Sequence, residues 1–126
     1  MLVHVAVAVI VNQHEQILIS KRSAVQHQGD KWEFPGGKVE QGETSRQALN
    51  REIREELGLN ILSADLLTII THQYSDKKVQ LDVYQVSDWQ GEPKPLEAQP
   101  IRWVEKGELH QYEFPQANVE ILKLLA

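Results

Sequence analysis

The chain has 126 residues, no cysteine, 41% hydrophobic residues and a formal net charge of −5. This length predicts a single domain over residues 1–126, and the lack of cysteine excludes disulfides, a thiol nucleophile and a cysteine-ligated metal. The acidic balance argues against stable, non-specific binding to nucleic acid.

The chain begins with extended segments. Residues 3–11 form a β-branched run and residues 16–20 resume the apolar pattern, which predicts a hairpin with its turn near residues 12–15. The first run is too short to span a bilayer and lacks the basic leader of a signal peptide. We therefore expect a cytoplasmic protein with no membrane contact. Residues 22–31 are polar and are predicted to form a loop.

Proline and glycine dominate the next segment. Residues 32–34 are predicted to be extended, because Pro35 disfavours helix at the residue before it. The dipeptide Gly36-Gly37 after this proline predicts a tight turn. Residues 38–40 then form a short extended piece.

A helix is predicted to begin near residue 44 or 45. Thr44 and Gln47 have the spacing of a capping box, and Gly58 stands where a left-handed residue ends a helix. The apolar residues recur at helical spacing and should face the core; they are Ala48, Leu49, Ile53 and Leu57.

Further strands and a second helix complete the pattern. Residues 62–74 and 78–86 are predicted strands joined by a turn at residues 74–77, and residues 100–104 form another short strand. Residues 115–125 are predicted to form an amphipathic helix whose inner face holds Val119, Leu122 and Leu125. The sequence therefore predicts an α/β fold with a mixed β-sheet between helices.

The first helix carries three glutamates on one face. Glu52, Glu55 and Glu56 stand at positions i, i+3 and i+4, where like charges destabilise a helix. Arg51 and Arg54 are predicted to project from other sides of the helix. An acidic face of this kind suits a hard divalent cation such as Mg²⁺, which takes oxygen ligands. The alternative is a solvated charge run on a surface helix.

Residues 37–59, GKVEQGETSRQALNREIREELGL, fit the pattern G-x5-E-x7-R-E-U-x-E-E-x-G-U, with U a bulky aliphatic. The fixed positions are filled by Gly37, Glu43, Arg51, Glu52, Ile53, Glu55, Glu56, Gly58 and Leu59. This pattern is the Nudix box, so the chain resembles the Nudix hydrolases, which cut a nucleoside diphosphate linked to another group. The segments WEFPGGKVEQGET, QGEP, EAQPIRWV and FPQAN resemble the MutT branch of that family, whose members remove oxidised guanine nucleotides.

The resemblance implies a fold and a reaction. The fold is the Nudix α/β/α sandwich. The reaction is attack of water on the β-phosphorus of a nucleoside triphosphate, which gives nucleoside monophosphate and pyrophosphate. It implies Mg²⁺ as cofactor, with Mn²⁺ as a substitute, and 8-oxo-dGTP as substrate. We expect the protein to be a monomer.

The resemblance also implies roles for residues near the box. The implied metal ligands are the Gly36 carbonyl, Glu52, Glu55, Glu56 and, from another loop, Glu97. Glu52 would also act on the attacking water. Arg51 is placed with Glu52 in the catalytic centre, where it would orient loop and helix together with Glu43 through charge-assisted bonds.

The implied base-reading residue is Asn118, in FPQAN. An Asn amide carries an acceptor beside donors, so it can donate to O6 of 8-oxoguanine and accept from N7–H. The alternative for Asn118 is an ordinary amide on the helix surface. The other predicted substrate-binding residues are Arg22 (phosphate or sugar), His27 and Lys77 (loops over the substrate), Phe34 (base pocket or core) and Lys38 (diphosphate or solvent).

Two other functions stay open at the level of sequence. The segment Leu81-Asp82-Val83-Tyr84 is less aromatic than the corresponding MutT pattern. A pyrophosphohydrolase acting on pyrimidine (CTP-like) or other modified nucleotides is therefore the main alternative. A catalytically silent nucleotide sensor is less favoured, because such domains lose box glutamates that this chain keeps. A nucleic-acid-binding module has little support, since no basic aromatic stripe is present.

Overall fold

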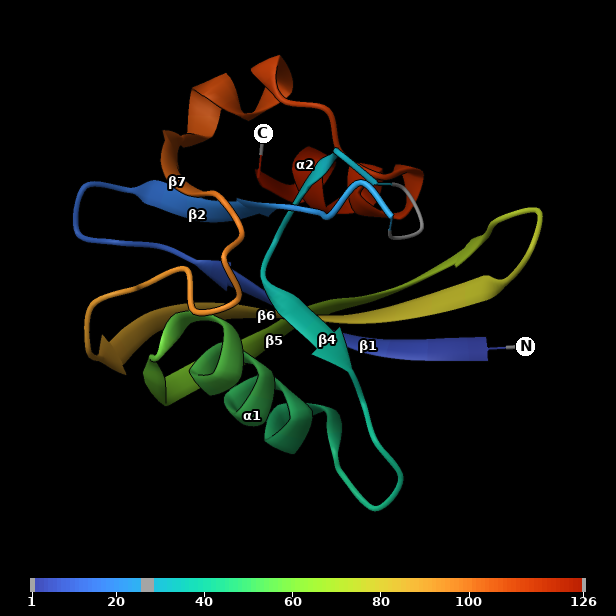
Figure 1. Cartoon of the computed structure of the whole chain (residues 1–126), viewed down its shortest axis with the longest axis horizontal. Helices are drawn as coiled ribbons and strands as arrows, with labels where there is room; N and C mark the ends of the chain where they lie inside the picture. Colours follow the sequence, from blue (N-terminus) through green and yellow to red (C-terminus); the bar gives the residue numbers. More distant parts are fainter. Residues whose placement is uncertain (1, 26–28, 126) are drawn as a thin grey trace.

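The computed structural model describes residues 2–25 and 29–125. Their strands form two sheets (Figure 1). The first sheet has the order β4 (Gly36–Lys38), β1 (Leu2–Ile10), β6 (Lys78–Gln90) and β5 (Asn60–Gln73). The second has the order β3 (Trp32–Glu33), β2 (Gln16–Lys21) and β7 (Ile101–Glu105). Because β1 runs parallel to β6 and antiparallel to β4, the first sheet is mixed, as predicted.

The predicted hairpin between the first two strands is wrong, although its turn is correct. Asn12 organises the turn, since its Oδ1 accepts hydrogen bonds of 2.9 Å from the amides of His14 and Gln16. Beyond the turn, the two strands enter different sheets, and their pairing among the described residues is one bridge between Val11 and Ile17. The reason is competition, because both edges of β1 are already taken by β4 and β6.

The helix α1 (Ser45–Leu57) follows its predicted bounds. Thr44 Oγ1 accepts from the Gln47 amide at 3.1 Å and the Gln47 side chain accepts from the Thr44 amide at 2.9 Å, which completes the capping box. Gly58 ends the helix with a φ of 72°. The predicted core residues are buried against β1, where Ala6 and Ala8 leave room for the helix to approach.

The C-terminal helix is shorter than predicted. A 3₁₀ turn, η2 (Gln116–Asn118), precedes α2 (Val119–Leu125), and a second 3₁₀ segment, η1 (Lys106–Gln111), was not predicted. The 3₁₀ turn has about three residues per turn and so changes the phase of the buried face. The inner face is therefore centred on Ile121 and Leu125 rather than on Val119 and Leu122.

Each face of β1 contributes to a different core. Ala6, Ala8 and Ile10 pack with α1, whereas Val7 and Val9 pack with side chains from the second sheet and α2. The predicted turn at residues 74–77 joins β5 to β6, with a 2.8 Å hydrogen bond from Tyr74 N to Lys77 O. None of the described helices combines the length and hydropathy that a membrane crossing requires.

Candidate active site

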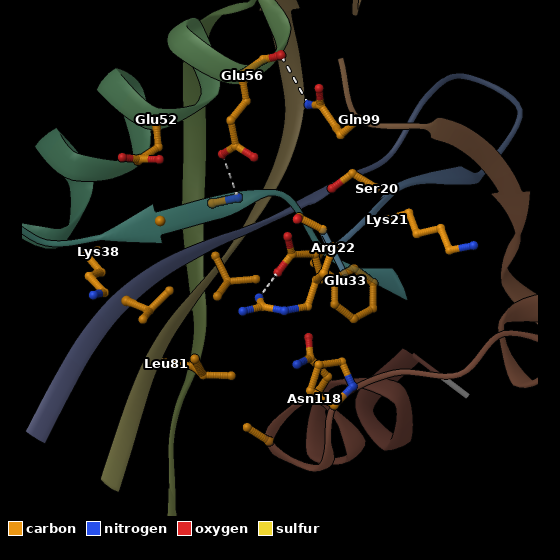
Figure 2. A pocket seen from close by; sticks show the side chains of 18 of the residues that line it. Ser20, Lys21, Arg22, Glu33, Lys38, Glu52, Glu56, Leu81, Gln99 and Asn118 are labelled. Atoms are coloured by element: carbon orange, nitrogen blue, oxygen red, sulfur yellow. Dashed lines mark hydrogen bonds and ion pairs between the residues drawn. The ribbon is translucent and has the colours of Figure 1, made fainter. Parts of the chain in front are cut away.

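A cleft of about 860 Å³ lies where the two sheets, α1 and η2 meet (Figure 2). Its lining includes nine of the predicted site residues, which are Arg22, Phe34, Gly36, Lys38, Glu52, Glu56, Lys77, Glu97 and Asn118. Arg51 and Glu55 are not among the lining residues. His27 lies outside the described residues. We call this space the active-site cleft.

The strand β4 brings backbone against the glutamates of α1. The predicted tight turn at Gly36-Gly37 is wrong, because both residues belong to β4 and pair with Val7 and Ala6 of β1. A Cβ atom at Gly36 would overlap the Ala6 carbonyl, and one at Gly37 would overlap the Glu52 carboxylate. Gly36 is therefore required by the close approach of β1, and a side chain at Gly37 would displace the Glu52 carboxylate.

Glu56 is buried among other carboxylates. It is only 7% exposed, and its Oε2 accepts a 3.2 Å hydrogen bond from the Gly36 amide. The pKa of Glu56 is raised to about 9, mainly by burial and in addition by the charges of Glu33, Glu52 and Glu97, while the Gly36 hydrogen bond opposes the rise. The acidic face of α1 is thus not wholly exposed to solvent.

Arg51 lies with the glutamates, which corrects the prediction that it projects away from them. Its Nε donates to Glu43 at 2.7 Å and its Nη1 donates to Glu52 at 2.6 Å. Its Nη2 also donates to the Lys38 carbonyl at 3.0 Å. A long guanidinium side chain can reach around the helix, and its five donors join the loop to the helix.

Glu52 is held between Arg51 and the cleft. Burial raises the pKa of Glu52, and the hydrogen bond and charge of Arg51 oppose that shift. Its carboxylate faces β4 beneath α1 (Figure 2). Glu55, in contrast, is 52% exposed and lies 3.4 Å from Arg51.

The loop at residues 94–99 places Glu97 by capping α1. The amides of Lys94 and Leu96 donate to the carbonyls of Leu57 and Glu56, each at 3.0 Å. These bonds satisfy carbonyls that the helix end leaves without partners. Gln99 also donates to the Glu56 carbonyl at 3.3 Å and accepts from the Glu97 amide at 3.0 Å. Glu97 therefore lines the active-site cleft together with Glu52 and Glu56.

The carboxylates fit a divalent cation by their chemistry, but they are not preassembled around one. No group of three or more acidic or histidine side chains in the described part of the chain is arranged to hold a metal ion as it stands. One cause is that Arg51 engages Glu52 and Glu55. Burial and the negative charges of neighbouring carboxylates nevertheless raise the pKa of Glu56, and a bound cation would offset both effects. Hard oxygen donors in such surroundings suit Mg²⁺ or Mn²⁺.

The opposite end of the cleft is apolar. Phe34 is buried and stacks on Phe114 with ring centroids 5.1 Å apart. Asn118 is 8% exposed, yet its side chain makes no hydrogen bond with another described residue. A buried amide without protein partners is uncommon and needs an explanation, such as a bound ligand. The lining around it also includes Val3, Val5, Val79 and Leu81.

The segment that departs from the MutT pattern contributes to the cleft through one residue. Leu81 lines the cleft, whereas Asp82 bonds His4 at 2.9 Å and Tyr84 bonds Ser45 at 2.6 Å on the α1 side of the sheet. Strand alternation explains this division, because successive side chains point to opposite faces.

Three residues at the site were not identified from the sequence. Glu33 lines the cleft and pairs with Arg22. Gln99 fixes the loop of Glu97, and the Tyr74 hydroxyl accepts a 2.9 Å hydrogen bond from the Ala117 amide beside Asn118. Glu33 stands inside the motif WEFPGG, and this position is the one sequence signal that could have placed Glu33 at the site.

Known proteins resemble the chain over nearly its whole length. The family model described as NUDIX domain matches residues 6–124. The 8-oxo-dGTP diphosphatase of Escherichia coli strain K12 is 37% identical over 121 residues, covering 96% of this chain and 94% of that protein. The CTP pyrophosphohydrolase of the same strain is 35% identical over 117 residues, covering 93% and 87%. A solved MutT structure, from work on the Aliivibrio salmonicida and Vibrio cholerae proteins, has a TM-score of 0.84 and 33% identity, covering 98% of this chain and 94% of that chain.

The chain belongs to the Nudix family. The predicted sandwich fold and the predicted class of enzyme, a Nudix hydrolase of nucleotides, are confirmed. Enzymes of this family generally use a divalent metal ion.

Proposed function

We propose that this Nudix hydrolase converts 8-oxo-dGTP to 8-oxo-dGMP and pyrophosphate. The observation that carries the substrate is the buried Asn118 amide, which has no hydrogen-bond partner among the described residues and lines the apolar end of the cleft. Glu52 and Glu56 of α1 lie at the other end (Figure 2), and Glu97 also lines the cleft. A purine at Asn118 would leave its phosphates toward Glu52 and Glu56. Relatives named 8-oxo-dGTP diphosphatase support the same substrate.

The carboxylate end would hold Mg²⁺ and prepare the attacking water. We assign Glu52, Glu55, Glu56, Glu97 and the Gly36 carbonyl as ligands; Glu55 would have to turn in from the rim. When bound, the cation neutralises charge on the reacting phosphates. Glu52, fixed by Arg51 at 2.6 Å, would accept a proton from the water that attacks the β-phosphorus. Lys38 lines the cleft and would contact the phosphates, whereas Lys77, which also lines the cleft, would cover the substrate from its loop.

The other end would distinguish oxidised from normal guanine. The Asn118 amide can donate to O6 and accept from N7–H, whereas the unprotonated N7 of guanine would face the amide oxygen. Phe34 would pack against the base, with its position fixed by Phe114. Arg22 would contact the sugar or a phosphate. His27 lies outside the described residues, so its role in a loop over the substrate stays a prediction from the sequence.

The deciding experiment is a hydrolysis screen with Mg²⁺ over ordinary and oxidised nucleoside triphosphates, with the products resolved. We expect 8-oxo-dGTP to have the highest kcat/KM and pyrophosphate to be the first inorganic product. Orthophosphate as the first product would exclude attack at the β-phosphorus. Equal rates for dGTP and 8-oxo-dGTP would reject the proposed substrate.

A pyrimidine triphosphate is the second candidate. It is favoured by the 35% identity to a relative named CTP pyrophosphohydrolase. The same screen separates the two substrates, because a pyrimidine presents no N7 edge to Asn118. A monomeric state and a cytoplasmic location stay predictions from the sequence, and both agree with an enzyme that acts on free nucleotides.

A further inference from the structure

Glu33 is an unexpected residue in a cleft for a polyanion. It lines the active-site cleft, and its side chain is only 23% exposed. A carboxylate there repels phosphate, and its charge also raises the pKa of Glu56. None of the roles proposed above for the cleft uses Glu33.

The geometry around Glu33 fixes the side chain of Arg22. Glu33 of β3 lies opposite Ser20 of β2. Ser20 stands two residues before Arg22 in the chain, so the strand pairing brings Arg22 close to Glu33. Arg22 Nη1 donates to Glu33 Oε1, and the Arg22 side chain is 22% exposed. The Arg22 amide also donates to the Lys31 carbonyl at 2.8 Å. Arg22 is therefore anchored through both its backbone and its guanidinium.

The pair also changes what Arg22 can attract. A guanidinium beside a carboxylate forms a pair with no net charge, so its long-range attraction for a triphosphate is small. Its directional N–H donors remain useful for hydrogen bonds at short range. In Figure 2 the pair lies between Glu56 and Asn118, toward the end of the cleft where we place the nucleoside. An unpaired Arg22 would instead be attracted to Glu56 or to the phosphates.

We propose that Glu33 is a positioning residue that directs Arg22 onto the neutral nucleoside part of the substrate and keeps it away from the phosphates. This inference rests on the proposed function of the cleft, and it assigns Arg22 to the sugar or base rather than to phosphate. It predicts that losing Glu33 weakens recognition of the nucleoside and leaves pyrophosphate binding unchanged.

The test is calorimetric binding of three probes, each with Mg²⁺: 8-oxo-dGMP, its nucleoside 8-oxo-2′-deoxyguanosine, which carries no phosphate, and pyrophosphate. When Glu33 is replaced, the nucleoside and 8-oxo-dGMP should lose affinity by the same factor, because the lost contact is to the sugar or the base. For Glu33→Gln, which keeps the size of the side chain, we expect the Kd of 8-oxo-dGMP to rise about tenfold, the effect of one charge-assisted hydrogen bond. The Kd of pyrophosphate should stay within about twofold, and kcat for 8-oxo-dGTP within about threefold of wild type. Glu108→Gln, at an exposed glutamate of η1, is the matched control and should change none of these Kd values.

A double-mutant cycle tests whether Glu33 acts through Arg22. Arg22→Ala should weaken 8-oxo-dGMP binding by a similar factor, and Glu33→Gln should add nothing in that background. An unchanged Kd of 8-oxo-dGMP in Glu33→Gln, an unchanged Kd of the nucleoside, an equal loss for 8-oxo-dGMP and pyrophosphate, or additive losses in the double variant would each overturn the inference. If Glu33→Gln does not fold, Arg22→Ala still tests the inference. Its loss of affinity must then affect 8-oxo-dGMP and spare pyrophosphate. A wild-type protein that releases no pyrophosphate from any nucleotide would instead reject the proposed function, and the binding measurements would still decide the role of Glu33.

Discussion

At the scale of single residues, the most constrained group is the Glu56 carboxyl. It is buried beside three other carboxylates, and without a cation its pKa rises to about 9. In the unfolded chain it would titrate near 4.5. Between these values the folded state binds a proton that the unfolded state has lost, so the free energy of unfolding decreases as pH rises.

The first prediction follows from this decrease of stability with rising pH. In the presence of a chelator, Glu56→Gln should be more stable than wild type at pH 8.5, by on the order of 5 °C in Tm, and the difference should shrink toward pH 5. Added Mn²⁺ should raise the Tm of wild type more than that of the variant. Thermal unfolding at both pH values measures this. A Tm difference independent of pH would show that Glu56 is not protonated in the folded chain.

The second prediction concerns the Glu52 carboxylate. Glu52→Gln keeps an oxygen that can accept from Arg51, but it removes the charge and the basicity. We expect kcat to fall roughly 10²–10⁴-fold with the fold intact. Single-turnover hydrolysis and circular dichroism provide the measurements, with Glu108→Gln as the control. Activity within a few-fold of wild type would remove Glu52 from the mechanism.

The third prediction concerns base selectivity at Asn118. Asn118→Ala removes the buried amide and should reduce the preference for 8-oxo-dGTP over dGTP by roughly tenfold to a hundredfold, because a buried polar mismatch costs about 1–3 kcal/mol. The ratio of kcat/KM for the two nucleotides, measured in both proteins, is the readout. If that ratio is unchanged, Asn118 does not read the base.

At the scale of elements, the end of α1 and the loop at residues 94–99 form one structure. The loop donates three hydrogen bonds to the last carbonyls of the helix and carries Glu97. Gln99 contributes one of those bonds and also accepts from the Glu97 amide. Metal binding should therefore depend on a residue that is not itself a ligand.

The fourth prediction tests that dependence. Gln99→Ala should weaken Mn²⁺ binding about tenfold, the scale of losses when an outer partner of a ligand is removed, and should lower stability by about 1 kcal/mol. Calorimetric titration with Mn²⁺ and urea unfolding measure the two effects. Gln116→Ala, at an exposed position in η2, is the control. Unchanged Mn²⁺ affinity with reduced stability would restrict Gln99 to a structural role.

Elements with local signals were predictable from the sequence, and those decided by distant partners were not. The bounds of α1 depend on Thr44, Gln47 and Gly58, all within the helix or next to it, and the prediction was correct. The pairing of β1 depends on β6, which lies more than sixty residues later in the chain, and the predicted hairpin was wrong. The same reasoning applies to Glu33, because its partner Arg22 becomes its neighbour only through the pairing of β2 with β3.

At the scale of the whole molecule, the active-site cleft joins parts that the chain builds separately. Its lining comes from both sheets, from α1 and from η2. A nucleotide that spans the cleft would contact all of these parts at once. Binding to the folded state alone raises the free energy of unfolding by mass action.

The fifth prediction uses that linkage. With Mg²⁺ present, 8-oxo-dGMP at one hundred times its Kd should stabilise the protein by about 2.7 kcal/mol. Asn118→Ala at the same nucleotide concentration should show a smaller Tm shift, because its Kd is higher. Thermal shift measurements over a nucleotide series provide the test. An equal Tm shift in both proteins would show that Asn118 does not contribute to nucleotide binding.

The contacts of Arg51 have a consequence for how related genes could recombine. The guanidinium satisfies its donors within the same short segment, on Glu43, Glu52 and the Lys38 carbonyl. Residues 36–59 therefore behave as a cassette, and a crossover between residues 44 and 50 would unite an arginine from one parent with a loop from the other. Chimaeras joined at residues 35 and 60 keep all the partners of Arg51 within one parental segment. Those two junctions are where grafting of this segment between homologues should succeed.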